Sequence, residues 1–164
     1  MVCQVSAHTS FYTKGVSPSM TEKKIFTKIL VGVDDSADSQ LAFKYAIKRA
    51  RLEDAELYIV SVLESDDRSV YEALSKAFIH GERAQLVEHV NEYVQQAHEA
   101  GVENVFPVIA EGDPGKEIVN TVIPSIKPEV LIVGSLAKKG PKKYLGSQAA
   151  YMAKYAPISV LVVR

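Results

Sequence analysis

A glycine- and lysine-rich segment near the C-terminus has the residue types that can hold a phosphate group. Gly134 and Gly146 would let the backbone approach an anion, and the amides of Gly146, Ser147 and Gln148 would open a helix whose positive end favours negative charge. Four lysines between the two glycines add positive charge. The alternative is a solvated connector followed by a helix-capping serine, and the pattern alone leaves both interpretations open.

A cluster of small and acidic residues follows the first apolar run of the sequence. Asp34, Ser36 and Asp38 are typical of the turn that caps a helix. Asp34 also stands at the end of a predicted strand, where its carboxylate could contact a ligand sugar or a bound divalent cation. Asp34 is therefore a candidate for capping and for ligand binding.

Other motifs that could carry chemistry are incomplete. Residues 112–116 read Gly-Asp-Pro-Gly-Lys but lack the Ser or Thr of a phosphate loop, so they predict a helix start. His80, His89 and His98 are nine residues apart, which places successive rings on opposite sides of a helix and predicts surface residues. No nucleophile elbow, dinucleotide fingerprint or evident general base is present, so we expect at most slow hydrolysis and no catalytic residue.

Alternating strands and helices must position these candidates. Nearly continuous apolar runs predict buried strands, and apolar residues at helical spacing predict helices between them. The predicted strands are 29–33, 57–63, 105–110, 130–133 and 159–163, and the predicted helices follow Ser36, span 70–100, run from Pro114 to about Ile126, and span 147–155. Gly81 is expected to divide the second helix and Gly101 to cap it, and Pro124 should end the third helix near its C-terminus.

This alternation requires parallel strands, because each helix returns the chain to the same end of the sheet. We therefore predict an α/β fold, a doubly wound five-stranded parallel sheet sandwich of the Rossmann-like type. Ligands of such sheets bind beyond the carboxyl ends of the strands, where the strand order reverses. Function is expected at Asp34, near Val62, at Gly112 and around Gly134.

Composition and charge narrow the class of protein. The chain of 164 residues, with 47% hydrophobic and 24% charged residues, fits one soluble globular domain. Its 19 basic and 20 acidic residues give a formal charge of -1, which disfavours binding to nucleic acid or to an anionic membrane. The single cysteine, Cys3, excludes an intrachain disulfide and favours a cytoplasmic protein. Residues 1–24 are predicted to be a flexible extension, and residues 25–164 the domain.

Three segments resemble the universal stress protein family. They are Lys-Ile-Leu-Val-Gly-Val-Asp-Asp-Ser at 28–36, Gly-Asp-Pro at 112–114, and the ending 146–164, which begins Gly-Ser-Gln-Ala-Ala-Tyr. The resemblance covers 28–164 and implies the adenine nucleotide α-hydrolase-like version of the predicted sheet. It also implies a homodimer that pairs the last strands, here Val160, Leu161, Val162 and Val163.

The ATP-binding branch of that family carries Gly-x-x-Gly, nine further residues, then Gly followed by Ser or Thr. Gly134 matches the first glycine, and Gly146 with Ser147 matches the final pair. Ala137 replaces the second glycine, and the spacer to Gly146 is one residue short. The added methyl could obstruct close backbone approach or disfavour a positive φ, so these two departures bear directly on whether ATP binds.

The resemblance leaves two functions open. The first is a dimeric stress-response module that binds ATP with magnesium and signals through its bound state. The nucleotide-binding residues it implies are Gly32, Val33, Asp34, Val62, Val133, Gly134, Ala137, Gly146, Ser147 and Gln148, with Asp34 meeting magnesium through the nucleotide. The second is a dimeric interaction module that does not bind ATP, in which the altered loop contacts a protein. An enzyme of the related nucleotide α-hydrolase class would need a second substrate site, and the sequence indicates none.

Overall fold

The computed structural model describes residues 25–64, 72–135 and 145–164, and it describes the side chains of α2 only at residue 81 and from residue 83 onward. In chain order the elements are β1 (Lys28–Gly32), α1 (Ala37–Glu53), β2 (Glu56–Leu63), α2 (Glu72–Glu99), β3 (Val105–Glu111), α3 (Pro114–Glu117), η1 (Ile118–Val122), α4 (Ile123–Ile126), β4 (Val130–Gly134), α5 (Ser147–Tyr155) and β5 (Ser159–Val163). The five strands form one parallel sheet in the order β3-β2-β1-β4-β5. The predicted doubly wound five-stranded sheet is confirmed.

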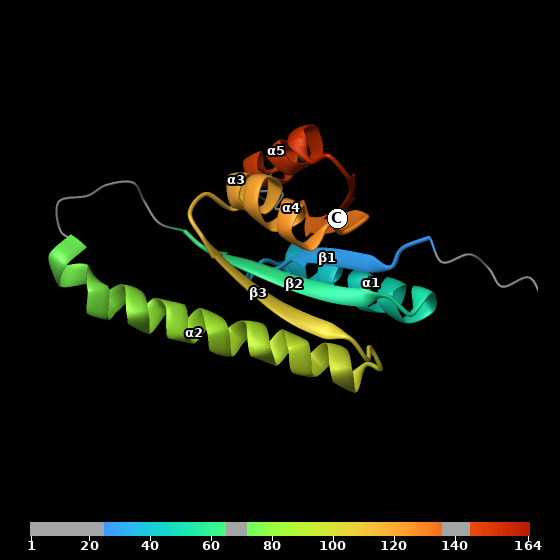
Figure 1. Ribbon diagram of the computed structural model, residues 1–164, viewed down its shortest axis with the longest axis horizontal. Coiled ribbons are helices and arrows are strands. Elements are labelled where there is room, and N and C mark those ends of the chain that lie inside the picture. Colours follow the sequence, from blue (N-terminus) through green and yellow to red (C-terminus); the bar gives the residue numbers. More distant parts are fainter. Residues whose placement is uncertain (1–24, 65–71, 136–144) are drawn as a thin grey trace, which may run out of the picture.

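Helices cover both faces of the sheet (Figure 1). α1 and α2 pack on one face, and the stretch from α3 through α4 packs with α5 on the other. Successive strand residues enter alternate layers, so that Ile29 and Val31 face the α1 and α2 layer while Leu30 faces the opposite layer. Because both faces are covered, β1 and β4 are apolar along almost their whole length.

The long helix α2 differs from its prediction. It runs without a break from Glu72 to Glu99, so the prediction that Gly81 divides it is wrong. A glycine inside a helix costs only about 1 kcal/mol relative to alanine and does not by itself end the helix. Gly101 has φ +89 just beyond the last turn, as expected of a C-terminal cap. Within the described ranges no helix is long and apolar enough to cross a bilayer.

Pro124 does not interrupt the helical stretch that begins at Pro114. Its turns widen into the π-helix η1 just before the proline, and Pro124 then lies in the first turn of α4, where a missing N–H costs little. The stretch reaches Ile126 and ends where Lys127 adopts the left-handed conformation with φ 57. The helix therefore continues to Ile126, and Pro124 does not shorten it.

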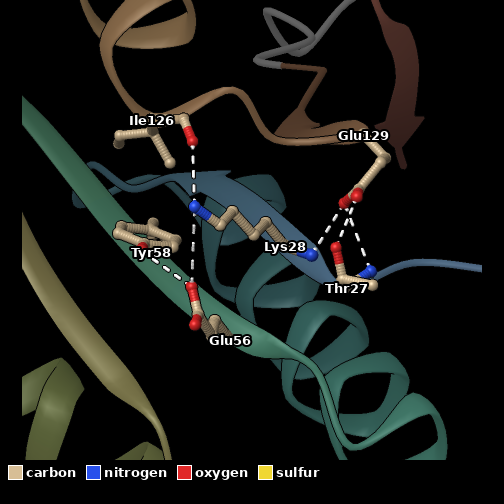
Figure 2. Close-up of polar contacts among 6 residues, drawn as sticks. All are labelled: Thr27, Lys28, Glu56, Tyr58, Ile126 and Glu129. Carbon is tan, nitrogen blue, oxygen red and sulfur yellow. Dashed lines mark hydrogen bonds and ion pairs between the residues drawn. The ribbon is translucent and has the colours of Figure 1, made fainter.

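A polar network fastens the amino-terminal edge of the sheet (Figure 2). The Glu129 carboxylate accepts hydrogen bonds from the backbone N–H groups of Thr27 at 3.2 Å and Lys28 at 2.7 Å. The Lys28 ammonium lies 3.9 Å from Glu56, which also accepts a hydrogen bond of 2.8 Å from the Tyr58 hydroxyl. These contacts tie the starts of β1 and β2 to the residue that precedes β4, at the edge opposite the candidate site.

Candidate functional site

A pocket of about 170 Å³ lies at the carboxyl ends of β1, β2 and β4. The chain leaves β1 for β2 on one side of the sheet, whereas β4 and β5 lie on the other side, so the strand order reverses between β1 and β4. Ligands bind at this kind of switch point in open α/β sheets. The pocket therefore lies at the edge where the sequence predicted a site.

Nine of the residues predicted for nucleotide binding line this pocket, namely Gly32, Val33, Asp34, Val62, Val133, Gly134, Gly146, Ser147 and Gln148. The tenth, Ala137, lies outside the described residues, as do the four lysines of the same loop. Gly112, which the sequence also singled out, is at the turn before α3 with φ +127 and is not in the lining. The fold thus brings together residues from four separate parts of the sequence, 32–34, 62, 133–134 and 146–148.

Sequence reasoning missed several residues that line the pocket: Val60, Ser61, Glu64, Pro114, Ile118, Ala149 and Met152. Two signals could have found some of them. Val60 is two residues before Val62 on β2, so the two side chains share a face, and Met152 is one helical turn after Gln148. Pro114 and Ile118 depend on how α3 and η1 pack onto the sheet, which the local pattern does not reveal.

Asp34 supports the turn between β1 and α1. Its Oδ1 accepts a hydrogen bond of 2.9 Å from the Ser36 N–H, and its own N–H donates to the Ser39 hydroxyl at 2.8 Å. The helix cap itself is Ser36, whose hydroxyl accepts from the Ser39 N–H at 3.1 Å. Asp34 is therefore not the cap, and its exposed side chain is held at the pocket by the turn.

The N-terminus of α5 opens into the pocket without a side-chain cap. Gly146 is the N-cap, with φ -58 and ψ 150, and Ser147 is the first helical residue. The alternative that Ser147 is a helix-capping serine is therefore wrong. α1 and α3, by contrast, are capped by the side chains of Ser36 and Asp113. An uncapped N-terminus presents backbone N–H groups and the positive end of the helix dipole, which together favour an anion.

Gln148 links the starts of α3 and α5. Its Oε1 accepts a hydrogen bond of 2.7 Å from the Gly115 N–H, and its Nε2 donates to Asp113 at 3.2 Å. The hydrogen bond from the Lys116 N–H, followed by that from Gln148, holds the pKa of Asp113 below its ordinary value. The Gln148 side chain is thus engaged with protein, which leaves its backbone N–H as the group available to a ligand. The helix start predicted at Asp113 and Pro114 is confirmed.

Gly134 has a packing role that the sequence did not indicate. A Cβ at this position would lie 2.5 Å from the Ser39 nitrogen and 2.6 Å from the Asp38 carbonyl carbon. Only glycine lets the end of β4 pass this close to the first turn of α1. This contact requires a glycine whether or not a phosphate is bound.

Within the described part of the chain no group of three or more His, Cys, Asp or Glu residues could hold a metal ion. His89 is partly exposed, and its Nε2 lies 3.0 Å from the exposed Asp35 carboxylate. His98 is exposed, with its Nδ1 2.9 Å from the Val102 carbonyl oxygen. The His80 side chain lies outside the described residues.

Comparison with known proteins gives consistent matches. Residues 26–164 match the Universal stress protein family. A Staphylococcus aureus (strain USA300) protein named for the same family is 30% identical over 140 residues, which cover 85% of this chain and 84% of that protein. The universal stress protein UspA from Lactobacillus plantarum superposes with a TM-score of 0.73 at 23% identity, covering 84% of this chain and 97% of the other.

Two further solved structures carry adenine nucleotides. A universal stress protein in complex with cAMP superposes with a TM-score of 0.66 at 22% identity, covering 85% of this chain and 97% of the other. The universal stress protein from Archaeoglobus fulgidus in complex with dAMP gives a TM-score of 0.61 at 20% identity, covering 85% of this chain and 99% of the other. The structural likenesses agree with the fold described above, and the match over 26–164 spans nearly the whole described chain. The chain therefore belongs to the universal stress protein family.

Proposed function

We propose that this protein binds an adenine nucleotide, with ATP and magnesium as the specific ligand, in the pocket at the carboxyl edge of the sheet. One observation carries the proposal: the uncapped N-terminus of α5 and the Asp34 carboxylate line the same pocket. Apolar side chains such as Val62 and Met152 line the same pocket and suit a base. The ligands named for the cAMP and dAMP complexes support the same chemical class.

The residues present fit such a ligand in separate roles. The first-turn amides of α5 at Ser147 and Gln148 would hold phosphate oxygens, and Gly146 leaves the approach to them open. Asp34 would meet the ribose or a magnesium ion held mainly by the phosphates, because Mg²⁺ in such sites typically takes one or two protein carboxylates. Magnesium would neutralise phosphate charge. The bound state itself, rather than turnover, would be the signal.

We further propose a cytoplasmic homodimer formed through β5. This strand pairs with β4 on one side and forms the edge of the sheet on the other. Its apolar side chains Val160, Leu161, Val162 and Val163 are only half buried. An exposed apolar edge strand is a template for pairing with another chain, and a second copy would cover it.

Thermal unfolding of the full chain tests nucleotide binding. ATP with magnesium should raise the midpoint by mass action, because it binds only the native state, and GTP should raise it less. The Gly146→Val variant should fold but lose the ATP-dependent rise, because its side chain would stand at the entrance to the α5 amides. AMP tests whether the β- and γ-phosphates contribute. Cooperative unfolding with no shift by any nucleotide would contradict the proposal.

The second candidate is the dimeric interaction module that does not bind ATP. The replacement of a family glycine by Ala137 and the shortened spacer to Gly146 favour it. In that case Gly146→Val should change neither the midpoint in the presence of ATP nor the folded state. A protein partner captured through the 136–144 loop would then be the expected finding.

A further inference from the structure

Helix α2 contacts the loop that follows β1 through the buried hydroxyl group of Tyr93. Tyr93 is 2% exposed, and its hydroxyl donates a hydrogen bond of 3.3 Å to the backbone carbonyl of Asp34. The same hydroxyl accepts a hydrogen bond from the Gln40 side chain on α1. It therefore connects α2, α1 and the loop after β1 at a single point.

Ring packing fixes the position of this hydroxyl. The Tyr93 ring meets Phe43 edge-on, with centroids 4.8 Å apart, and meets His89 edge-on at 5.0 Å. His89 also reaches the same loop, because its Nε2 lies 3.0 Å from the Asp35 carboxylate. Edge-to-face aromatic pairs are directional and hold ring orientation. Two neighbouring residues of the loop, Asp34 and Asp35, are thus contacted from one face of α2.

The Tyr93 hydroxyl is suited to donate toward Asp34. Burial raises the pKa of Tyr93, and the nearby charges of Asp35 and Asp34 raise it further, whereas the Gln40 hydrogen bond lowers it. The phenol is consequently protonated at neutral pH. Its proton can be donated to the Asp34 carbonyl while its oxygen accepts from Gln40.

We propose that Tyr93 is a positioning residue of the nucleotide pocket, acting from α2 through Asp34. Asp34 is held at its carbonyl by Tyr93, at its N–H by Ser39, and at its carboxylate by Ser36. Removing the hydroxyl releases the carbonyl and widens the range of positions open to the carboxylate at the pocket. This inference rests on the proposed nucleotide binding for its functional consequence, and on the contacts above for the positioning itself.

The test compares two hydroxyl deletions in the full chain. Tyr93→Phe removes the donor and keeps the ring that packs against Phe43 and His89. Tyr58→Phe is the matched control, because its hydroxyl donates to Glu56 at 2.8 Å at the opposite edge of the sheet. Titration calorimetry with ATP plus magnesium should show affinity weakened about two- to tenfold in Tyr93→Phe, the range of one lost neutral hydrogen bond, and unchanged affinity in Tyr58→Phe.

A double-mutant cycle with Asp34→Ala separates positioning from a general loss of stability. If Tyr93 acts through the Asp34 carboxylate, Tyr93→Phe should weaken binding little in the Asp34→Ala background. Equal weakening in both backgrounds, or wild-type affinity in Tyr93→Phe, would overturn the proposal.

Amide hydrogen exchange of the nucleotide-free protein keeps this test distinct from that of the proposed function. Exchange at Asp34 and Ser36 should accelerate in Tyr93→Phe and stay unchanged in Tyr58→Phe. If the wild-type protein binds no nucleotide, the proposed function fails, while faster exchange at these amides still supports the positioning. Unchanged exchange at these amides would overturn the positioning whatever the result with nucleotide.

Discussion

At the residue scale, Gly134 shows how one position can serve the fold and the pocket together. Its backbone lines the pocket, and its missing side chain lets β4 pass the first turn of α1. The sequence cannot distinguish the role in packing from the role in the pocket, because both call for glycine. The free energy of unfolding measured without a ligand reports the packing role alone.

We expect Gly134→Ala to lower the free energy of unfolding by about 1 to 3 kcal/mol, because the new methyl would overlap the backbone of Asp38 and Ser39. Urea denaturation without nucleotide measures this loss. Gly81→Ala is the control, since a Cβ there meets nothing within 4 Å. That variant should gain about 0.5 to 1 kcal/mol from the better helix propensity of alanine. Equal stability of Gly134→Ala and wild type would contradict the packing argument.

At the scale of elements, a different set of polar contacts holds the elements together at each edge of the sheet. The carboxyl edge uses the Ser36 cap of α1 and the Gln148 bridge between α3 and α5. The amino-terminal edge uses Glu129, which joins the start of β1 to the residue before β4 (Figure 2). Partial burial favours the neutral acid, but hydrogen bonds from Thr27 and from the Lys28 N–H outweigh it and hold the pKa of Glu129 below its ordinary value.

A lowered folded-state pKa means that the ionised Glu129 stabilises the fold above its unfolded-state pKa. This contribution is lost as the pH falls through the folded-state pKa. We therefore expect Glu129→Gln to be less stable than wild type near neutral pH. The difference in the free energy of unfolding should shrink in acid, where the wild-type Glu129 is protonated and uncharged, as glutamine is at every pH. The difference should be modest because Glu129 is exposed.

Urea denaturation at a series of pH values measures this dependence. Glu103→Gln is the matched control for replacing one glutamate at an exposed position. If the difference in the free energy of unfolding between Glu129→Gln and wild type stayed constant from neutral to acid pH, the carboxylate would not stabilise the fold through its charge.

At the scale of the whole molecule, the parallel order leaves β3 and β5 at the two edges of the sheet. The Val163 carbonyl accepts a hydrogen bond of 2.9 Å from the Ser135 N–H, so the backbone groups of Val163 face the side of β4. Because strand residues alternate, the backbone groups of Val160 and Val162 face the open edge. A partner strand would pair with these outward groups.

Val162→Pro removes one outward N–H group, and a proline is tolerated on an edge strand when that group is not needed inside the sheet. We expect this variant to fold and to sediment as a monomer if the proposed β5 homodimer exists. Leu161→Pro is the contrasting variant, because its N–H faces β4 and its loss should destabilise the fold itself. An unchanged dimer in Val162→Pro would place the interface elsewhere.

The local pattern of the sequence was enough to determine much of this molecule. Apolar runs and helical spacing are local properties, so they located all five strands to within one residue at each end, and with them the parallel sheet. The cap at Asp113 and the left-handed Gly101 followed from residue type. The edge where a ligand would bind followed from the parallel order, and nine of the residues predicted for the pocket line it.

Only the tertiary structure decided which side chains meet. The Tyr93 hydroxyl and the Asp34 carbonyl are 59 residues apart in the sequence, and Gln148 reaches Gly115 across 33 residues. Periodicity places each of these residues on a helix or in a loop, but it does not say how two helices pack on a sheet. The sequence predicts Gly134 only as a position where the backbone could approach an anion. That the first turn of α1 also requires a glycine there follows from the packing of β4 against α1. Packing joins distant residues, which a local pattern cannot encode.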